Sequence, residues 1–283
     1  MTPQETLSYH ARSFAPATRA LSRADRGRIA RLYALCRTLD DLADTVGGPD
    51  ISARLTRLEL DLRSAAGTDP LAIEARTLFS GKPLGLESFA ALVKTLASDT
   101  AETCIATDAE LDHYCMGVAG TVGIMVCALF EVDPQWHRRA ADLGKAMQLT
   151  NICRDVMTDA QAGRRYLPYT MCPHEPDAIA GARQKAHADV RRAVGKLLAR
   201  ADQLYASGRM GLPALPLRLR LAVTAAAAMY AGIGDELRAN SCNPARGRVF
   251  VPTWRKFLLV TGATASGLRP RVLAWKDRQH AET

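Results

Sequence analysis

Hydrophobic residues along this chain fall in long segments without proline, and no segment alternates apolar and polar residues as a half-buried strand does. Alanine, leucine and arginine dominate these segments, and all three favour helices. Asn-Gly and Asp-Gly hairpin turns are absent. The pattern predicts an all-α protein with one domain over residues 1–283 and about ten helices. The proline-free stretches of helical length are 17–48, 84–133, 135–167, 177–212, 217–243 and 253–269.

Local residue chemistry predicts several element boundaries. Ser22 can cap a helix whose first turn contains Asp25, where a carboxylate is favoured by the helix dipole. A later helix should end near Gln161–Arg165, because Gly163 can adopt the left-handed conformation of a C-terminal stop. The segment Thr170–Pro176 contains two prolines and is expected to form a loop.

A polar stripe lies on the helix expected after Ser22. Steps of three and four residues place side chains on one helical face. Two carboxylates four residues apart repel each other unless a cation lies between them, and Mg²⁺ prefers such hard oxygen ligands. A solvated acidic face, partly paired with arginine, explains the stripe equally simply. The stripe consists of Tyr33, Arg37, Asp40 or Asp41, and Asp44.

A second stripe repeats this geometry further along the chain. Gln148, Asn151, Asp155 and Asp159 are spaced by three, four and four residues, and Arg154 lies beside them. Polar groups in such a row are costly to bury without partners. A solvated face is again the simpler alternative. Two facing stripes could together hold several Mg²⁺ ions, which would bind a diphosphate and assist its departure. A carbocation left behind would need a dry apolar cavity.

Composition and charge narrow the choice of partner. The net charge is +8, and 48% of the 283 residues are hydrophobic. Between Arg246 and Arg278 there are eight Lys or Arg residues and one acid, Asp277. No nucleic-acid recognition module is present and aromatic residues make up only 6%, so a diphosphate substrate or a membrane surface fits this charge better than nucleic acid.

The apolar segments and cysteines indicate the compartment. The uncharged runs Gly117–Phe130 and Leu221–Gly234 are each 14 residues long, which suits core helices better than membrane spans. The N-terminus has no apolar signal core. The seven cysteines form no Cys-x-x-Cys pair and are expected to be reduced. We therefore expect a cytoplasmic protein. The basic C-terminal segment, with Trp254, Phe257, Leu258, Leu259, Val260 and Trp275, could place it peripherally on the inner face of the membrane or simply form a last core helix.

Several motifs in order resemble the squalene/phytoene synthase family of head-to-head (1′-1) prenyltransferases, nearest to its bacterial phytoene and dehydrosqualene synthases. The resemblance covers almost the whole chain. The second acidic block, followed by Gly-Arg-x-Tyr-Leu-Pro, is the most specific part, and Tyr230 and Arg248-Val-Phe-Val251 match weaker features. The motifs are His10-Ala-Arg-Ser-Phe14, Tyr33–Asp44, Tyr114-Cys-Met-Gly-Val-Ala-Gly-Thr-Val-Gly123, Gln148–Asp159 and Gly163–Pro168.

The resemblance implies a fold and a set of roles. The fold would be an isoprenoid-synthase-type helical bundle that encloses a central apolar cavity. The implied metal ligands are Asp40, Asp44, Asn151, Asp155 and Asp159. The implied catalytic residues are these four aspartates with Tyr33, Arg37, Tyr114 and Arg154, and the tyrosines among them would line the cavity together with Tyr230. The implied substrate-binding residues are Arg12, Ser13, Phe14, Gln148, Asn151, Tyr230 and Arg248.

One departure and one glycine series bear on these roles. The family often has serine where this chain has Ala11, so the resemblance supports phosphate contact by Arg12 and Ser13 rather than by residue 11. The glycines at 117, 120 and 123 do not follow a strand and are not a dinucleotide loop. We expect them to permit close helix packing or to shape the cavity.

The resemblance implies Mg²⁺-dependent coupling of two allylic diphosphates, with Mn²⁺ as a possible substitute, through a cyclopropylcarbinyl diphosphate. Thr18 and Ala30 are small, and if they line the tail pocket they leave room for C20 tails, which favours geranylgeranyl diphosphate and phytoene. NADPH is not expected for phytoene. Farnesyl diphosphate giving presqualene diphosphate, dehydrosqualene or, with NADPH, squalene is the alternative. A head-to-tail prenyltransferase, a terpene cyclase and a non-catalytic relative fit the motifs less well, and the oligomeric state stays open.

Overall fold

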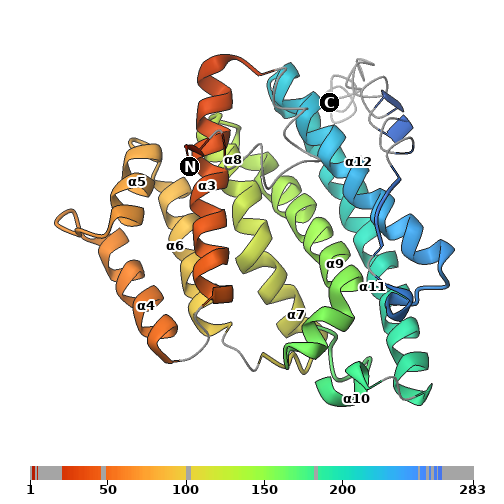
Figure 1. The fold of residues 1–283 in the computed structure, drawn as a ribbon. Helices are drawn as coiled ribbons and strands as arrows, with labels where there is room; N and C mark the ends of the chain where they lie inside the picture. Colours follow the sequence, from red (N-terminus) through yellow and green to blue (C-terminus); the bar gives the residue numbers. More distant parts are fainter. Residues whose placement is uncertain are drawn as a thin grey trace, which may run out of the picture.

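A computed structural model describes residues 2, 3, 5, 21–45, 49–99, 103–181, 184–247, 249–252, 255, 258, 259, 261 and 262. Ten α-helices run through this described part (Figure 1), which confirms the all-α prediction. They are α3 (Arg23–Thr45), α4 (Pro49–Arg63), α5 (Pro70–Leu78), α6 (Pro83–Ser98), α7 (Asp108–Cys115), α8 (Thr121–Leu129), α9 (His137–Gln161), α10 (Pro176–Ala180), α11 (Gln184–Gly211) and α12 (Leu217–Ala239). Among the residues described, β pairing is limited to one isolated bridge between Cys104 and Arg165.

The helix ends follow the predicted chemistry. The Asp25 amide donates to Ser22 Oγ at 3.1 Å, and Ser22 Oγ donates to Asp25 Oδ2 at 2.7 Å, so both residues cap the start of α3. At the end of α9, Gly163 has φ +77°, and the Arg164 amide donates to the Asp159 carbonyl at 2.9 Å. Both predicted boundaries are confirmed. Helices α4 and α5 lie outside the proline-free stretches that we singled out, and each begins at a proline.

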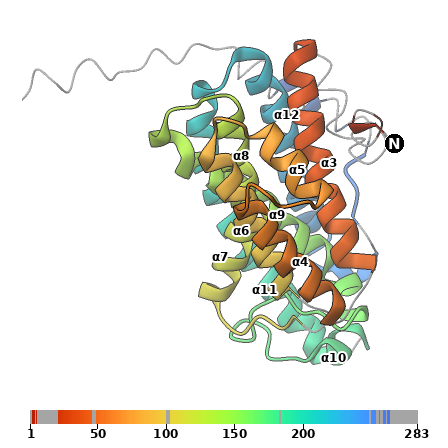
Figure 2. The same ribbon diagram turned by 90° about the vertical axis from the view of Figure 1, so that its left-hand side faces the viewer.

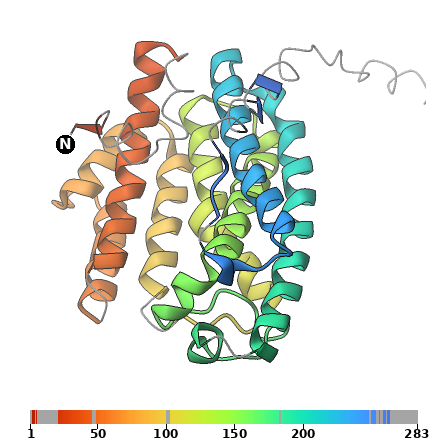
Figure 3. The same cartoon turned by 45° about the vertical axis from the view of Figure 1, so that its right-hand side comes forward.

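Helix α9 is the central element of the bundle. It packs against α8, α11 and α12, and its contacts with α11 and α12 form one of two large hydrophobic cores (Figures 1 and 3). The second core joins α3, α4, α5 and α6 with buried residues of α8, and α3, α4 and α5 lie nearest the viewer in Figure 2. Both acid-bearing helices, α3 and α9, run downward in Figure 1, so their C-terminal ends lie toward the same end of the bundle.

Two glycines allow α9 to pack closely against α8 and against the turn Met116–Gly120 that precedes it. A Cβ added at Gly123 would lie 2.3 Å from the Ala140 carbonyl oxygen, and one added at Gly144 would lie 2.1 Å from the Ala119 carbonyl oxygen. Both neighbours are backbone atoms, so no side-chain rotation could relieve the clash. Gly123 also lines the cavity described below, so its place agrees with the packing and cavity-shaping role expected for the glycines at 117, 120 and 123; Gly144, outside that series, lines the cavity too.

A π-helical turn, η1 (Met116–Gly120), joins α7 to α8. The continuous helical stretch Asp108–Leu129 is long and apolar enough, by length and composition, to cross a membrane. The sequence analysis predicted no membrane span, because its uncharged runs are only 14 residues long. Its residues pack against α6 and α9 and line the central cavity, so its apolar character is accounted for by core packing. The sequence pattern did not predict the π turn, which often marks a functional region of a helix.

All seven cysteines are free thiols, as predicted. Cys153 is completely buried in the core around α9, and Cys115 and Cys127 are also buried. Burial raises the pKa of Cys127 to about 11, so this thiol stays protonated and acts as a small apolar core residue.

Candidate active-site cavity

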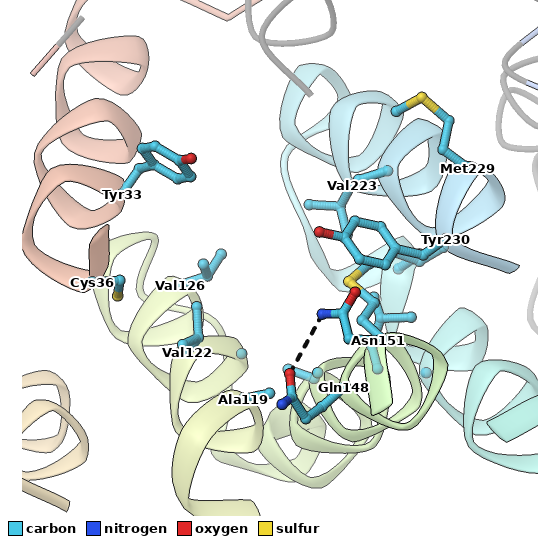
Figure 4. Close-up of a pocket in the computed structure, with 18 of the residues that line it drawn as sticks. Tyr33, Cys36, Ala119, Val122, Val126, Gln148, Asn151, Val223, Met229 and Tyr230 are labelled. Carbon is cyan, nitrogen blue, oxygen red and sulfur yellow. Dashed lines mark hydrogen bonds between the residues drawn. The ribbon is translucent and has the colours of Figure 1, made fainter. Parts of the chain in front are cut away.

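A cavity of about 790 Å³ lies between α3, α8, α9 and α12, which confirms the predicted central apolar cavity. Its size is within the range of roughly 300–1,000 Å³ that is usual for ligand sites. The wall is largely hydrophobic, and its side chains come from helices far apart in sequence (Figure 4). Along α9 the lining residues run from Arg154 back to Ala140, a depth of about 21 Å at 1.5 Å per residue.

The polar lining residues gather at one end of the cavity. Gln148, Asn151 and Arg154 line it from α9, and Tyr33 and Tyr230 line it from α3 and α12. Figure 4 shows both phenols directed into the space between these two helices, with Asn151 beneath Tyr230. The structure thus brings the five predicted site residues to the same end of the cavity.

The amide of Asn151 points to a missing ligand. Its Nδ2 donates a long hydrogen bond of 3.5 Å to Gln148 Oε1 (Figure 4). Its Oδ1 is buried and accepts no hydrogen bond from any described part of the chain. A buried acceptor without a partner costs free energy in a native protein. An oxygen held in this way at a cavity wall suits a cation or a donor group of a bound ligand.

The second acidic pair lies one to two turns beyond Asn151. Arg154 Nε donates to Asp155 Oδ1 at 2.9 Å, and a second contact joins Arg154 Nη2 to Asp155 Oδ2, so the pair is bidentate. Burial and the neighbouring charge of Asp155 raise the pKa of Asp159 to about 7. The charged form of Asp159 is therefore disfavoured by its surroundings, as expected for a carboxylate whose countercharge comes from a ligand.

The first acidic block is more exposed. Asp40 and Asp41 both face solvent, and Arg37 forms its ion pair with Asp41 rather than Asp40. Arg37 Nε is buried and lacks a hydrogen-bond acceptor among the described residues. The backbone of Asp44 belongs to α3, but its side chain lies outside the described residues. The prediction that Asp40 and Asp44 are metal ligands is therefore untested.

Tyrosine 33 is half-buried at the cavity wall. Burial raises its pKa, while the nearby guanidinium of Arg37 opposes this shift. The phenol thus remains a hydrogen-bond donor at neutral pH. Tyr230 lies close enough to interact electrostatically with both Tyr33 and Arg154, so it links the α3 and α9 parts of the site.

The structure corrects the placement of Tyr114. We expected it to line the cavity, but it is not among the described lining residues. Its ring stacks on Tyr166 with centroids 4.9 Å apart, and the Tyr166 hydroxyl donates to Asp99 at 3.1 Å. Burial strongly raises the pKa of Tyr114. This tyrosine is partly buried and packs against the core formed around α9 and α11.

Ala30 is also displaced from its expected role. It is fully buried, yet Ile29 rather than Ala30 lines the cavity. The prediction that Ala30 lines the tail pocket is therefore wrong. The same prediction for Thr18 falls outside the described residues. Arg12, Ser13, Phe14 and Arg248 lie there too, as do the aromatic residues of the C-terminal segment.

Sequence reasoning missed the apolar end of the cavity. That end includes Trp136 before α9, Leu212 and Leu215 between α11 and α12, and Leu219 in the first turn of α12. Val249, Phe250 and Val251 add a further wall from beyond α12. The spacing of the tryptophan and the three leucines does not distinguish them from ordinary core positions, so only the fold could identify them. Val249–Val251, in contrast, belongs to the weaker C-terminal motif found in the sequence.

The residues at the polar end fit a bound cation. Asn151 supplies an unpartnered oxygen at the cavity wall. Asp155 and Asp159 supply carboxylates one and two turns further along α9, and neither is among the residues that line the cavity. Oxygen donors of this kind suit Mg²⁺, which keeps several waters and substrate oxygens in its shell. Among the side chains that the structure describes, no three His, Cys, Asp or Glu residues lie close enough to form a complete site by themselves. Any ion here would therefore take further ligands from substrate, from water or from Asp44.

Comparison with known sequences gives a consistent result. A family model described as squalene/phytoene synthase matches residues 7–255. The phytoene synthase of Rhodobacter capsulatus is 33% identical over 279 residues, which is 95% of this chain and 82% of the relative. The 15-cis-phytoene synthase of Pantoea ananas is 31% identical over 97% of this chain and 94% of its own length.

Solved structures show the same architecture. A dehydrosqualene synthase in complex with ligand superimposes with a TM-score of 0.78 at 25% identity, covering 93% of this chain and 94% of its own. The squalene synthase HpnC from Alicyclobacillus acidocaldarius superimposes with a TM-score of 0.74 at 26% identity, covering 86% of this chain and 94% of its own. The arrangement of helices around the cavity is therefore shared with these enzymes.

Proposed function

Because the chain belongs to the squalene/phytoene synthase family and is a prenyltransferase, we propose that it couples two geranylgeranyl diphosphates head to head to form phytoene. One observation carries the proposal: a single cavity of about 790 Å³ has polar groups at one end and a long apolar remainder. Such a cavity can hold diphosphate at one end and isoprenoid tails along the rest. The relatives named phytoene synthase support the C20 substrate.

The polar end would bind the diphosphate. Tyr33 and Tyr230 would donate hydrogen bonds to its oxygens, because their phenols face the same space (Figure 4). Arg37, whose Nε is buried beside this end, would contribute positive charge. Arg154 is already oriented by its bidentate pair with Asp155, so less conformational freedom is lost when it contacts a phosphate oxygen.

The carboxylates would hold the divalent cation. Asn151, Asp155 and Asp159 would be ligands from α9, and Asp40 and Asp44 would be ligands from α3. When bound, Mg²⁺ would supply Lewis-acid stabilisation of the departing diphosphate. A bound cation would also offset the raised pKa of Asp159, because it favours the ionised carboxylate.

The apolar part would protect the reactive carbons. In the first half-reaction the C1–O bond of one donor breaks, diphosphate leaves, and the double bond of the second molecule attacks C1 with loss of a proton. The cyclopropylcarbinyl diphosphate that forms then loses its own diphosphate, rearranges and loses a proton to give phytoene. Water would quench these cations, and the hydrophobic side chains of α8 and α12 along the cavity would exclude it.

A product assay tests this proposal. The purified protein is incubated with geranylgeranyl or farnesyl diphosphate and Mg²⁺, with and without NADPH, and the hydrocarbons are identified by mass. We expect phytoene from geranylgeranyl diphosphate whether or not NADPH is present. Conversion of farnesyl diphosphate alone would contradict the proposed tail length while leaving the head-to-head reaction in place.

A second candidate has its own supporting observation. The solved structures that superimpose on this chain include a squalene synthase and a dehydrosqualene synthase. The same chemistry on farnesyl diphosphate would give presqualene diphosphate, dehydrosqualene or, with NADPH, squalene. The same assay separates the two candidates, because C30 and C40 hydrocarbons differ in mass.

A further inference from the structure

The connection between α11 and α12 has an inner and an outer side. On the inner side, Leu212 and Leu215 line the apolar end of the cavity. On the outer side, Met210 is 47% exposed and Leu217 is 48% exposed. A few residues of chain therefore separate the apolar interior of the cavity from apolar side chains on the molecular surface.

Arginines flank these exposed apolar side chains. Arg209 and Arg218 are exposed and lie next to Met210 and Leu217 in the chain. From Asp202 to Asp235 the intervening residues include three arginines, the third being Arg220, and no acid. The local charge of this connection is therefore positive over its whole length.

The neighbouring end of α9 adds to this charge. A Cβ added at Gly211 would lie 2.7 Å from Arg139 Cβ, so the start of α9 packs directly beside the connection. Arg138 is exposed there. Asp142 is engaged within this region, because it accepts a hydrogen bond from Ser207, which in turn accepts one from Arg139 at 2.7 Å. Exposed acids near this end include Asp133, which caps the turn Pro134–Trp136.

We propose that this deep-end surface, formed by Arg138, Arg209, Met210, Pro213, Pro216, Leu217 and Arg218, docks on a bilayer that contains anionic lipids. Exposed apolar side chains flanked by cations are the pattern of interfacial membrane binding, in which apolar groups enter the acyl boundary and cations contact phosphates. Residues 203–234 include three arginines and no acid, and this sequence charge complements an anionic surface. A protein partner would not require this pairing of cations with protruding apolar residues.

The location of this surface gives docking a consequence. The connection lies at the top of Figure 1, at the end of the bundle opposite α10, whereas the acid-bearing ends of α3 and α9 point toward α10. A bilayer at the deep-end surface would therefore lie against the apolar end of the cavity and away from its polar end. Apolar tails could then pass between the cavity and the acyl region without crossing bulk water.

Vesicle co-sedimentation tests the surface without any turnover, so its failure is separate from failure of the proposed function. The full chain is mixed with vesicles of phosphatidylcholine alone or with 30% phosphatidylglycerol added, and the bound fraction is measured at low and high salt. We expect binding to the anionic vesicles that weakens as salt rises. The double variant Met210→Ser/Leu217→Ser should weaken binding roughly tenfold. The variant Arg209→Gln/Arg218→Gln should weaken vesicle binding at least fivefold. Each arginine that contacts lipid contributes a factor of about five.

A matched variant provides the control. Leu60→Ser/Ile73→Ser removes apolar side chains that are 64% and 47% exposed on α4 and α5, away from the deep-end surface. It should leave vesicle binding unchanged, and far-ultraviolet circular dichroism should show that all variants are folded. Absence of binding by the unmodified chain, equal binding to both vesicle types, or equal loss in the control and Met210/Leu217 variants would overturn the proposal.

Discussion

The hydroxyl of Tyr33 on α3 and that of Tyr230 on α12 are directed toward each other across the polar end of the cavity (Figure 4). Nearly 200 residues separate them in sequence, so only the closed bundle brings them together. Their shared direction defines where a polar substrate group can bind, because Asn151 and Arg154 of α9 line the same end. The account of diphosphate binding depends on this relationship.

Removal of one phenolic hydroxyl tests that relationship. Tyr230→Phe should lower kcat/KM by about 10–100-fold, since a hydrogen bond to a charged group contributes roughly 1.5–3 kcal/mol. The fold should be retained, because the ring still packs. Tyr169→Phe is the matched control: Tyr169 is 45% exposed and its ring, which stacks on Arg165, is preserved. Equal activity of the two variants would remove Tyr230 from the site.

Loss of a carboxylate tests the metal site. Asp155→Asn should reduce kcat by at least about 1,000-fold, because it weakens cation binding and also releases Arg154 from its bidentate pair. The measurement is initial rate against Mg²⁺ concentration. Asp177→Asn, on the exposed first turn of α10, is the control and should retain full activity. A variant at 155 that retains normal rate and Mg²⁺ dependence would contradict the site.

Asp159 should make the metal-free protein less stable as pH rises. Its folded pKa is about 7, above the ordinary value of 3.8, so the unfolded state loses its proton first. The stability that this group contributes is fully present below about pH 4 and is lost as pH rises through 7. Asp159→Asn should therefore stabilise the metal-free protein at pH 8 by on the order of 1–3 kcal/mol, with little gain near pH 4.

The measurement is thermal unfolding with chelator at several pH values, repeated with Mg²⁺. Added Mg²⁺ should raise the unfolding temperature of the unmodified protein at pH 8 more than that of Asp159→Asn. If the difference between the two proteins is constant with pH, Asp159 does not have the raised pKa described here.

The close contact between α9 and the turn η1 can be tested by a single methyl group. Gly144→Ala would place a Cβ 2.1 Å from the Ala119 carbonyl oxygen, so the helices must separate. The free energy of unfolding should fall by about 1–3 kcal/mol, measured by urea denaturation. Gly27→Ala in α3 is the control, because no heavy atom lies within 4 Å of the added methyl. That variant should be neutral or up to about 1 kcal/mol more stable.

A larger residue in the apolar part should shorten the pocket. Val126 lines the cavity from α8 and is half-buried between α3 and α12 (Figure 4). Val126→Phe should lower kcat/KM for geranylgeranyl diphosphate at least tenfold more than for farnesyl diphosphate, because the longer tail reaches further into the cavity. An equal decrease for both substrates would place the tails elsewhere.

Much of the fold and part of the site followed from local sequence patterns. The cap at Ser22 and the stop at Gly163 were predictable, because each depends on residues within one turn. The second polar stripe was predictable in part, since helical spacing places Gln148 and Asn151 on one face and both line the cavity. Asp155 and Asp159 of the same predicted stripe are not among the lining residues, whereas Arg154 beside them is.

The remaining features depend on which helices meet. Spacing on α3 allowed the pairing of Arg37 with Asp41, four residues later, but could not show that Ile29 rather than Ala30 lines the cavity. Tyr114 belongs to a conspicuous motif, yet its position relative to the cavity is set by its stacking on Tyr166, more than 50 residues away. Leu212 and Leu215 carry no local signal, because their role arises only where α11, α12 and α9 converge.

The most direct test of the central claim is a competition assay. Equal concentrations of geranylgeranyl and farnesyl diphosphate are supplied together with Mg²⁺ and without NADPH, and the hydrocarbon products are identified and quantified by mass spectrometry. The account predicts a C40 hydrocarbon with the mass of phytoene as the main product. A C30 hydrocarbon alone, or longer linear diphosphates without any head-to-head product, would contradict it.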